Sequence, residues 1–259
     1  MKLLQYFIFD SKKYSHYKFN SAKLDDLIKE FPTAMRNCYV EDSAIQRATT
    51  TSVDSKTVIK TYIPTKPHIK SGEFGEILSF YMLLEKYLPI KLTGVKKWFL
   101  KPDKNKAAFY TDVVLYSCGD TPSPQDLLVS AEVKAKVVRK NNNRIQDAVV
   151  GAEEDFVSRL ADTLVVLRDK SLQKGDAKTV KEVERFIESV EDNNGTYQKH
   201  IKAVLLIDSN LCDDEMKKEV VRKEKIDNFE IIVLCIEKLR EVYGAIYQEI
   251  PNSYIEITV

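Results

Sequence analysis

Two acidic residues and one lysine near the middle of the chain have the types and spacing that phosphodiester hydrolysis requires. Asp112 lies in an apolar run, and the next apolar run carries Glu132 and Lys134 two residues apart. A lone carboxylate buried in a strand is costly unless it has a charged partner or a metal ion. Residues two apart on a strand project from the same face. The sequence therefore predicts that these three side chains gather at one catalytic site if the two strands are neighbours.

The chemistry that suits these groups is metal-assisted. Phosphodiester hydrolysis needs an activated water, neutralisation of the phosphate charge and a stabilised leaving oxygen, and Mg²⁺ held by oxygen ligands supplies all three. Asp112 and Glu132 are the expected ligands, with Mn²⁺ as a substitute ion. Lys134 is expected to orient the water or to stabilise the phosphate. Glu76, on the preceding helix, is expected to add a carboxylate directly or through water, and Glu73 is the fallback if that helix is rotated.

Each part of this arrangement also has an ordinary structural explanation. A Glu-x-Lys pair on a strand is more often a solvated face or an ion pair, and Asp112 alone could pair with a lysine. Glu73 alone suits the positive end of a helix dipole. The order of the parts favours the catalytic interpretation: an acid-bearing helix, a strand with an acid, a loop, a strand with Glu-x-Lys, and then an amphipathic helix.

The apolar periodicity beyond residue 66 predicts an α/β fold. Residues 127–138 alternate between apolar and polar side chains, as in a strand with one apolar face. The strongly apolar later strands indicate a mixed central sheet flanked by helices. Helices are predicted at 71–87, 145–168, 180–190, 213–225 and 237–247, and strands at 95–100, 109–116, 127–138, 201–207 and 229–236.

The first quarter of the chain is less regular. Pro64 and Pro67 interrupt the sequence before the clear pattern begins. The prediction is an N-terminal α+β extension, residues 1–66, followed by the domain that carries the site, residues 67–259. Within the extension the sequence suggests a strand at 3–9, a helix at 21–31, and either a strand pair or an exposed loop at 48–61.

Two runs of basic residues flank the candidate site, although the whole chain has a net charge of only +1. A local basic patch is typical of proteins that grip a nucleic-acid backbone through its phosphates. Loop lysines that only improve solubility explain each run alone equally well. The predicted nucleic-acid contacts are Lys136, Arg139, Lys140 and Arg144. The second run comprises Lys96, Lys97, Lys101, Lys104 and Lys106.

Other features of the sequence exclude several chemistries. The chain has no Gly-x-x-x-x-Gly-Lys-Ser/Thr loop, no Gly-x-Ser-x-Gly elbow, no His-Glu-x-x-His and no Gly-x-Gly-x-x-Gly. The three histidines are too scattered for a metal cluster. No stretch is long enough to span a bilayer, and the interrupted apolar start suits a strand rather than a signal peptide. The wide cysteine spacing predicts free thiols in a cytoplasmic protein, at Cys38, Cys118, Cys212 and Cys235.

The motifs of the candidate site resemble the PD-(D/E)xK nuclease superfamily. The matching residues are Glu76, Thr111-Asp112 and Glu132-Val133-Lys134, with Thr111 where proline is usual. This resemblance implies a restriction-endonuclease-like core. It also implies that the backbone carbonyl of Val133 is an additional metal ligand.

A narrower resemblance covers roughly the last three-quarters of the chain. The stretch from residues 71–78 through residues 131–134 to residues 156–160 resembles the HamA family, the nuclease subunits of the Hachiman anti-phage system. This resemblance implies a defence effector that degrades DNA with little sequence preference and works with a superfamily 2 helicase, HamB. Residues 1–66 and the charged helix at residues 177–191 are the candidate helicase contacts.

Two other functions stay open from the sequence. One is a nuclease-like module that binds nucleic acid or a partner without catalysis, although the intact Asp112, Glu132 and Lys134 argue against a decayed site. The other is a site-specific restriction endonuclease, which would need a base-reading element in a DNA groove. No such element is recognisable in the sequence.

Overall fold

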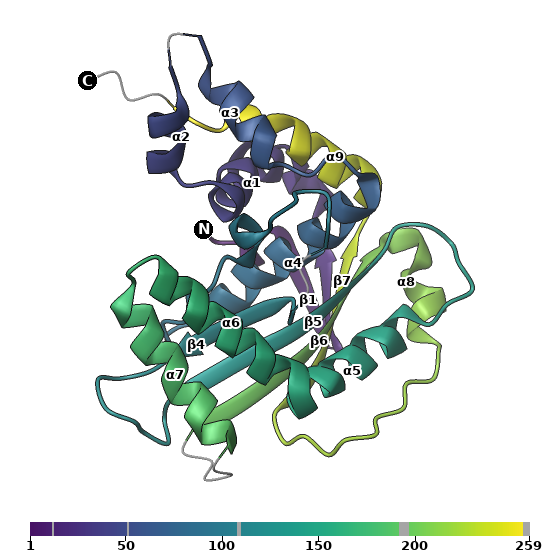
Figure 1. Ribbon diagram of the computed structural model, residues 1–259. Coiled ribbons are helices and arrows are strands. Elements are labelled where there is room, and N and C mark those ends of the chain that lie inside the picture. The colour runs from purple at the N-terminus through teal and green to yellow at the C-terminus, as the bar shows by residue number, and fades with distance from the viewer. Residues whose placement is uncertain (12, 51, 108–109, 192–196, 256–259) are drawn as a thin grey trace.

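A mixed sheet forms the centre of the molecule in the computed structural model, which describes residues 1–11, 13–50, 52–107, 110–191 and 197–255. Within those residues the sheet has seven strands in the order β1-β2-β7-β6-β5-β4-β3 (Figure 1). Strands β2, β7, β6 and β5 run parallel to one another, and the remaining pairs are antiparallel. The strands are β1 Phe7–Ser11, β2 Ser15–Phe19, β3 Thr93–Gly94, β4 Val113–Ser117, β5 Leu127–Lys136, β6 Gln198–Asp208 and β7 Phe229–Ile236. This confirms the predicted α/β class and the mixed central sheet.

Helices cover both faces of the sheet. One face packs against α1, α4 and α9 in the largest hydrophobic core, and the other packs against α5, α6, α7 and α8. The bounds are α1 Leu24–Tyr39, α2 Asp42–Ala48, α3 Ser55–Tyr62, α4 Pro67–Lys86, α5 Arg144–Glu154, α6 Leu160–Gln173, α7 Ala177–Glu191, α8 Ser209–Met216 and α9 Leu239–Glu249. No helix of the described residues is long and apolar enough to cross a membrane.

Strand β5 lies between the two helical layers, and this decides the environment of the predicted site. Val129, Ala131 and Val133 belong to the core beneath α4, as the alternation predicted. Glu132 projects to the opposite face and is only 3% exposed, because α5 covers that face. Most of the polar face of β5 is therefore buried rather than solvated, and Lys134 is its partly exposed member.

Helix α4 packs closely on β5 and brings its acids to the end of the sheet. It begins at Pro67, four residues before the predicted start, because proline is well suited to the first turn of a helix. A Cβ atom at Gly75 would lie 3.3 Å from Val133 Cγ1, so glycine permits this close approach.

Several predicted elements differ from the structure. The strands predicted at 3–9 and 109–116 begin only at Phe7 and Val113, and residue 109 lies outside the described residues. In the stretch 48–61, the part from Ser55 onward is helical rather than a strand pair or loop, because Asp54 accepts a hydrogen bond from the Thr57 amide and caps α3. Before it, Thr50 and Val53 form an isolated antiparallel bridge. The strand predicted at 95–100 is the 3-10 turn η3, Lys97–Leu100, whose first two side chains are buried. The helix predicted at 213–225 ends at Met216 in α8, and an irregular segment leads from there to β7.

The long helix predicted at 145–168 is interrupted by a π-helical turn. This turn, η4 Asp155–Arg159, lies between α5 and α6. Such turns insert an extra residue into a helix and often occur at functional sites. Here the turn carries Asp155 and Arg159 toward Glu132.

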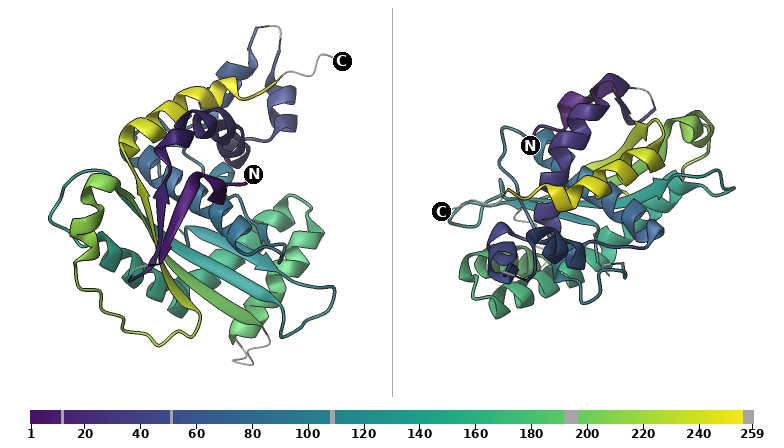
Figure 2. Two further views of the ribbon diagram at one scale, coloured as in Figure 1. Left: turned by 180° about the vertical axis from the view of Figure 1, so that it is seen from behind. Right: turned by 90° about the horizontal axis from the view of Figure 1, so that it is seen from above.

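The N-terminal segment shares the sheet and the core with the rest of the chain. Strand β2 pairs in parallel with β7, and α1 packs beside α9 (Figure 2, left). Phe31 and Met35 of α1 are fully buried. The domain boundary at residues 66 and 67 stays a prediction, and residues 1–39 contribute directly to the common core.

The prediction of four free thiols is wrong for two of the cysteines. Cys212 of α8 and Cys235 of β7 are joined as a disulfide, whereas Cys38 and Cys118 are free. The two bonded cysteines are 23 residues apart in the sequence, and only the packing of α8 on β7 brings them together.

Candidate active site

Asp112 lies at the point where the pairing of β4 with β5 ends. Val113, the first residue of β4, pairs with Ala131, so Asp112 comes opposite Glu132. Beyond this point the Asp112 side chain, instead of a β4 carbonyl, accepts the hydrogen bond of the next β5 amide. Its Oδ2 lies 2.8 Å from the Val133 amide nitrogen. The predicted neighbourhood of the Asp112 and Glu132 strands is thus present in the structure.

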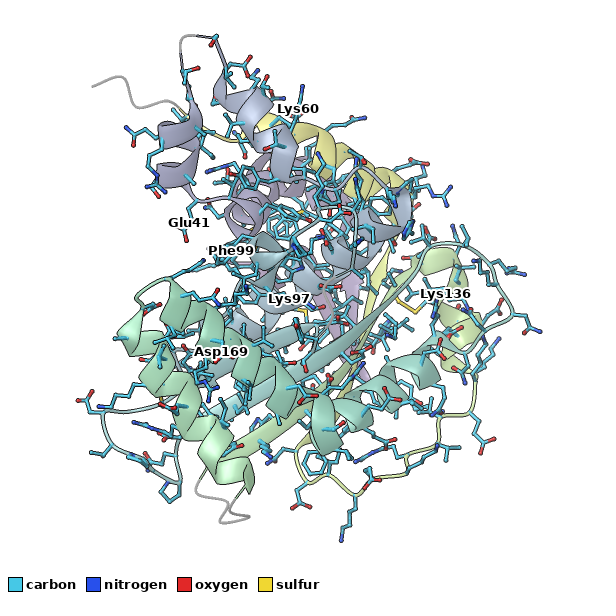
Figure 3. The ribbon with its side chains drawn as sticks, viewed as in Figure 1. Glu41, Lys60, Lys97, Phe99, Lys136 and Asp169 are labelled. Carbon is cyan, nitrogen blue, oxygen red and sulfur yellow. A yellow bond between two sulfur atoms is a disulfide. The ribbon has the colours of Figure 1, made fainter. Side chains whose placement is uncertain are left out.

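The ammonium of Lys97 lies between Glu76 and Asp112. Its Nζ is 3.2 Å from Glu76 Oε2 and 3.2 Å from Asp112 Oδ1. It also donates to the Thr111 carbonyl at 3.3 Å. Burial alone would lower the pKa of Lys97, but the two carboxylates raise it to about 12. The Lys97 side chain lies near the centre of the molecule in Figure 3.

Glu76 is held by two donors at this junction. Trp98 Nε1 donates to its Oε2 at 2.9 Å, beside the Lys97 ammonium. Burial raises the pKa of Glu76 to about 7, with a further contribution from the negative charge of Asp112, while Lys97 opposes the shift. The carboxyl group of Glu76 therefore titrates near neutral pH.

Glu132 is buried among basic groups. Its Oε1 pairs with Lys134, and its Oε2 lies 3.0 Å from Arg159 Nη2. Burial and the charge of Asp112 raise the pKa of Glu132, against the effects of Lys134 and Arg159. A Cβ atom on Gly151 would lie 2.7 Å from Glu132 Cγ, so α5 can cover this carboxylate only because it has glycine there.

Asp155 and Arg159 are site residues that the sequence reasoning missed. Asp155 is fully buried, and its Oδ1 lies 2.9 Å from Arg159 Nε and accepts from Thr111 Oγ1 at 3.1 Å. Its Oδ2 has no hydrogen-bond partner among the described residues. Burial raises the pKa of Asp155 to about 7, with a contribution from Glu132. The signal in the sequence was an acid and an arginine four residues apart beside a buried stripe.

A cleft of about 680 Å³ opens beside these residues. It is lined by the start of α4, the end of β5 with the following loop, and α9. Glu76 and Lys134 reach it, whereas Asp112 and Glu132 are not among its lining residues. Its basic lining residues include His68, Lys134, Lys140, Arg144 and Arg240, of which Arg240 comes from the far end of the chain.

The four predicted nucleic-acid contacts have different environments. Lys140 and Arg144 line the cleft, and Arg144 also pairs with Asp147 at 3.0 Å. Arg139 is exposed and lies 3.2 Å from Asp214. These three side chains lie at or near the surface and are within reach of a ligand.

Lys136 differs from the other three because it is buried. Its Nζ lies 2.6 Å from Glu215 Oε2 and donates to the carbonyls of Lys140 and Asn142. Lys136 therefore fixes the loop after β5 to α8, beside which it lies in Figure 3. Its ammonium is engaged by these three acceptors although Lys136 also lines the cleft, so its predicted phosphate contact stays a prediction.

Part of the second basic run is also internal. Besides Lys97, Lys101 is buried and pairs with Glu73. Glu73 Oε2 accepts from the Tyr39 hydroxyl at 2.9 Å, so this acid is engaged in the core between α1 and α4. Glu76, rather than the fallback Glu73, is thus the α4 acid that lies next to Asp112.

The carboxylate oxygens of the site suit a hard cation, but in the structure they contact the basic side chains of Lys97, Lys134 and Arg159. Glu76, Asp112, Glu132 and Asp155 offer carboxylate oxygens, which Mg²⁺ prefers. Among the described residues, one group of three His, Cys or acidic side chains has its ligand atoms within 4.8 Å of one another. This group is His16, Cys212 and Cys235. The acids of the site do not converge in this way. Asp155 Oδ2, which has no hydrogen-bond partner among the described residues, offers an acceptor for a further cation, whereas Lys97 already neutralises Glu76 and Asp112.

Comparison with known proteins identifies one family. No curated protein and no solved structure gives a significant match. The family model HamA matches residues 6–250, which is nearly the whole chain of 259 residues. HamA proteins are nuclease-like proteins of anti-phage defence. The chain therefore belongs to the HamA family.

Proposed function

We propose that this protein is a metal-dependent deoxyribonuclease that acts in an anti-phage complex with a helicase. The observation that carries the proposal is the position of Asp112 opposite Glu132 on adjoining strands. Lys134 lies on the same face of β5 as Glu132. Glu76 is joined to Asp112 through the Lys97 ammonium, which contacts both carboxylates. Family membership supports the defence role and the nuclease class.

The carboxylates would hold the ion, and Lys134 would act on the substrate. Asp112, Glu132 and Glu76 would be the side-chain ligands, and the Val133 carbonyl would be the additional ligand that the superfamily resemblance implies. Bound Mg²⁺ would activate water and neutralise charge on the phosphate. Lys134 is about one-third exposed and lines the cleft, so its ammonium can contact a phosphate there. Its ion pair with Glu132 would keep the ammonium beside the proposed metal ligands.

The cleft suits a nucleic-acid backbone. Lys140, Arg144 and Arg240 place positive charge along it, and contacts to phosphates carry no sequence information. This supports cleavage with little sequence preference over a site-specific restriction enzyme. The helicase partner follows from the resemblance to Hachiman nuclease subunits, and residues 1–66 and 177–191 stay its candidate contacts.

Cleavage assays on plasmid and linear DNA test the proposal. The native chain, with and without a co-expressed helicase partner, should cut DNA with Mg²⁺ or Mn²⁺ and stop when EDTA is added. Glu132→Gln and Lys134→Met should each lower the cleavage rate by about 100-fold or more while DNA binding is kept, since both changes act on the chemical step.

Matched controls are available on the surface. Glu237→Gln and Lys225→Met alter exposed residues outside the cleft and outside the candidate helicase contacts, and should leave cleavage unchanged. Cleavage that survives Glu132→Gln would contradict the mechanism. DNA binding without cleavage under every condition would instead support a binding module, and discrete fragments from random DNA would support a restriction enzyme.

A further inference from the structure

A second cluster of metal-binding side chains lies away from the candidate active site. His16 Nε2 is 3.1 Å from Cys235 Sγ and 3.6 Å from Cys212 Sγ, and all three residues are buried. They come from β2, β7 and α8, three elements that are far apart in the sequence. We propose that these residues, when the two cysteines are reduced, form a binding site for a thiophilic divalent cation such as Zn²⁺.

Sheet register explains why two of the ligands share a face. His16 pairs with Val233 across β2 and β7, and Cys235 is two residues further along β7 on the same side. Helix α8 covers this face and contributes Cys212. The Cα atoms of the two cysteines are 6.5 Å apart. This separation allows both thiolates to bind one tetrahedral zinc ion, with Zn–S bonds of about 2.3 Å.

The opposite side of the histidine ring also suits a metal ligand. Asp10 Oδ2 lies 3.9 Å from His16 Nδ1, across the β1–β2 hairpin in which the two residues pair directly. A carboxylate beside one nitrogen of a ligating histidine fixes the ring orientation and makes the metal-binding nitrogen a better donor. The Nε2 atom faces the two sulfurs, as this arrangement requires.

The ligand chemistry separates this cluster from the candidate active site. Thiolate and imidazole favour Zn²⁺ or another soft ion, whereas the carboxylates around Asp112 favour Mg²⁺ or Mn²⁺. Three protein ligands leave the fourth position of a tetrahedral zinc ion for water. The two sites therefore select different metals.

Metal binding and the disulfide are alternative states of the same two sulfurs. An external phosphine breaks the S–S bond, takes oxygen from water to become the phosphine oxide, and leaves one proton on each sulfur. Binding of Zn²⁺ then releases both protons as the thiolates coordinate the ion. No electrons are exchanged in the second step.

The bound ion would stabilise the region next to the cleft. Cys212 lies one helical turn before Glu215 on α8. Glu215 holds the Lys136 ammonium and accepts from the Arg144 and Ile145 amides at the start of α5. Fixing α8 to β2 and β7 would thereby support the loop that lines the cleft.

The test uses the full chain, reduced with a phosphine and freed of metal, and titrated with Zn²⁺ alone. We expect about one tightly bound Zn²⁺ per chain, with release of up to two protons and protection of two thiols from a thiol reagent. Co²⁺ should give thiolate-to-cobalt charge-transfer absorption. Cys212→Ser and Cys235→Ser should abolish this binding, His16→Ala should weaken it at least tenfold, and Cys118→Ser should leave it unchanged.

Two results would overturn the proposal. One is a reduced, folded native chain that binds no stoichiometric Zn²⁺, in which case the pair is a disulfide only. The other is Zn²⁺ binding that persists in Cys212→Ser or Cys235→Ser. If these variants fail to fold, the thiol-protection and cobalt spectra of the native chain still decide the question.

Discussion

At the level of single residues, the candidate site is organised by pairing buried acids with buried bases. Lys97 lies between Glu76 and Asp112, and Arg159 lies between Glu132 and Asp155. Such pairs are costly to break because the remaining charge stays buried. The same arrangement makes Lys97 the group that a cation shared by Glu76 and Asp112 would have to replace.

Replacing Lys97 tests this competition. Lys97→Met keeps an unbranched side chain but removes the charge, and should destabilise the protein by about 3 kcal/mol, as expected for a broken buried pair. Added Mg²⁺ should then raise the melting temperature of the variant more than that of the native chain, because the ion can take over the neutralising role. Thermal unfolding with and without Mg²⁺ measures both effects.

Lys101→Met is the matched control for this experiment. It removes another buried lysine, whose ion pair among the described residues is with Glu73 alone. This variant should also be less stable than the native chain, but Mg²⁺ should raise its melting temperature no more than that of the native chain. Equal Mg²⁺ shifts in both variants would argue against metal binding between Glu76 and Asp112.

At the scale of elements, two helices form the cover over Glu132. Helix α5 passes over the carboxylate at Gly151, and the π-helical turn η4 then directs Arg159 back toward it. Close packing of a helix on a charged group needs both a small residue and a compensating base. The sequence satisfies both needs within nine positions of the chain, from Gly151 to Arg159.

Gly151→Ala should disturb this cover. The added methyl group would lie 2.7 Å from Glu132 Cγ, so the carboxylate or the helix must move. We expect a loss of about 1 to 3 kcal/mol in unfolding free energy, as for other overpacked sites, and a fall in any nuclease activity. Chemical denaturation and DNA cleavage measure the two effects.

Gly244→Ala provides the comparison. Gly244 lies in α9, and nothing would come within 4 Å of its added Cβ atom. This variant should gain stability by about 0.5 to 1 kcal/mol, because alanine is the better helix former. Similar losses in both variants would mean that contact with Glu132 is not the cause.

Glu215 links α8 to the loop after β5, and its titration should appear in the acid stability of the protein. Burial would raise the pKa of Glu215, but hydrogen bonds from Lys136, Lys218 and the Ile145 amide outweigh it and hold the pKa below the usual 4.5. The carboxylate therefore stabilises the fold above about pH 4.5, and this stabilisation is lost as pH falls through the lowered pKa.

Glu215→Gln should remove this part of the pH dependence. At neutral pH the variant should be less stable by about 3 kcal/mol, since Lys136 stays buried without its charged partner. The difference from the native chain should shrink as pH falls below 4.5, the usual value for this carboxyl group. Urea unfolding from pH 7 to pH 3 checks this, with the exposed Glu237→Gln expected to follow the native curve. A constant difference across this range would refute the assignment.

At the scale of the whole molecule, residues 1–39 complete a sheet and core that the later chain begins. Strand β2 covers the edge of β7, and α1 lies on α9. The strand order places the first strands, β1 and β2, beside the last strand, β7, on one half of the sheet, and the candidate site on β4 and β5 in the other half (Figures 1 and 2).

A chain of residues 67–259 should therefore fail to fold cooperatively. It would expose the edge of β7 and the apolar surface that Phe31 and Met35 cover. Circular dichroism and thermal unfolding should show a broad, weak transition. Co-expression with a 1–66 fragment should restore a sharp one. A cooperative transition of 67–259 alone would instead support a separate N-terminal extension.

The sequence by itself determined the elements that local pattern specifies. The alternation in β5 is a property of neighbouring residues, so it predicted both the buried face with Val129 and Val133 and the shared face of Glu132 and Lys134. Strand β7 occupies the predicted residues 229–236. Apolar periodicity survives folding because each element must bury one face.

Only the tertiary structure decided which charges meet. Lys97 and Lys136 looked like surface lysines of basic runs, but long-range packing buries them beside Glu76 and Glu215. Asp155 reaches the site through a π-helical turn that apolar periodicity did not reveal. Charge pairing depends on burial and on distances between elements remote in sequence. Burial and these distances cannot be read from local spacing in the sequence, and both are set by the packing of helices on the sheet.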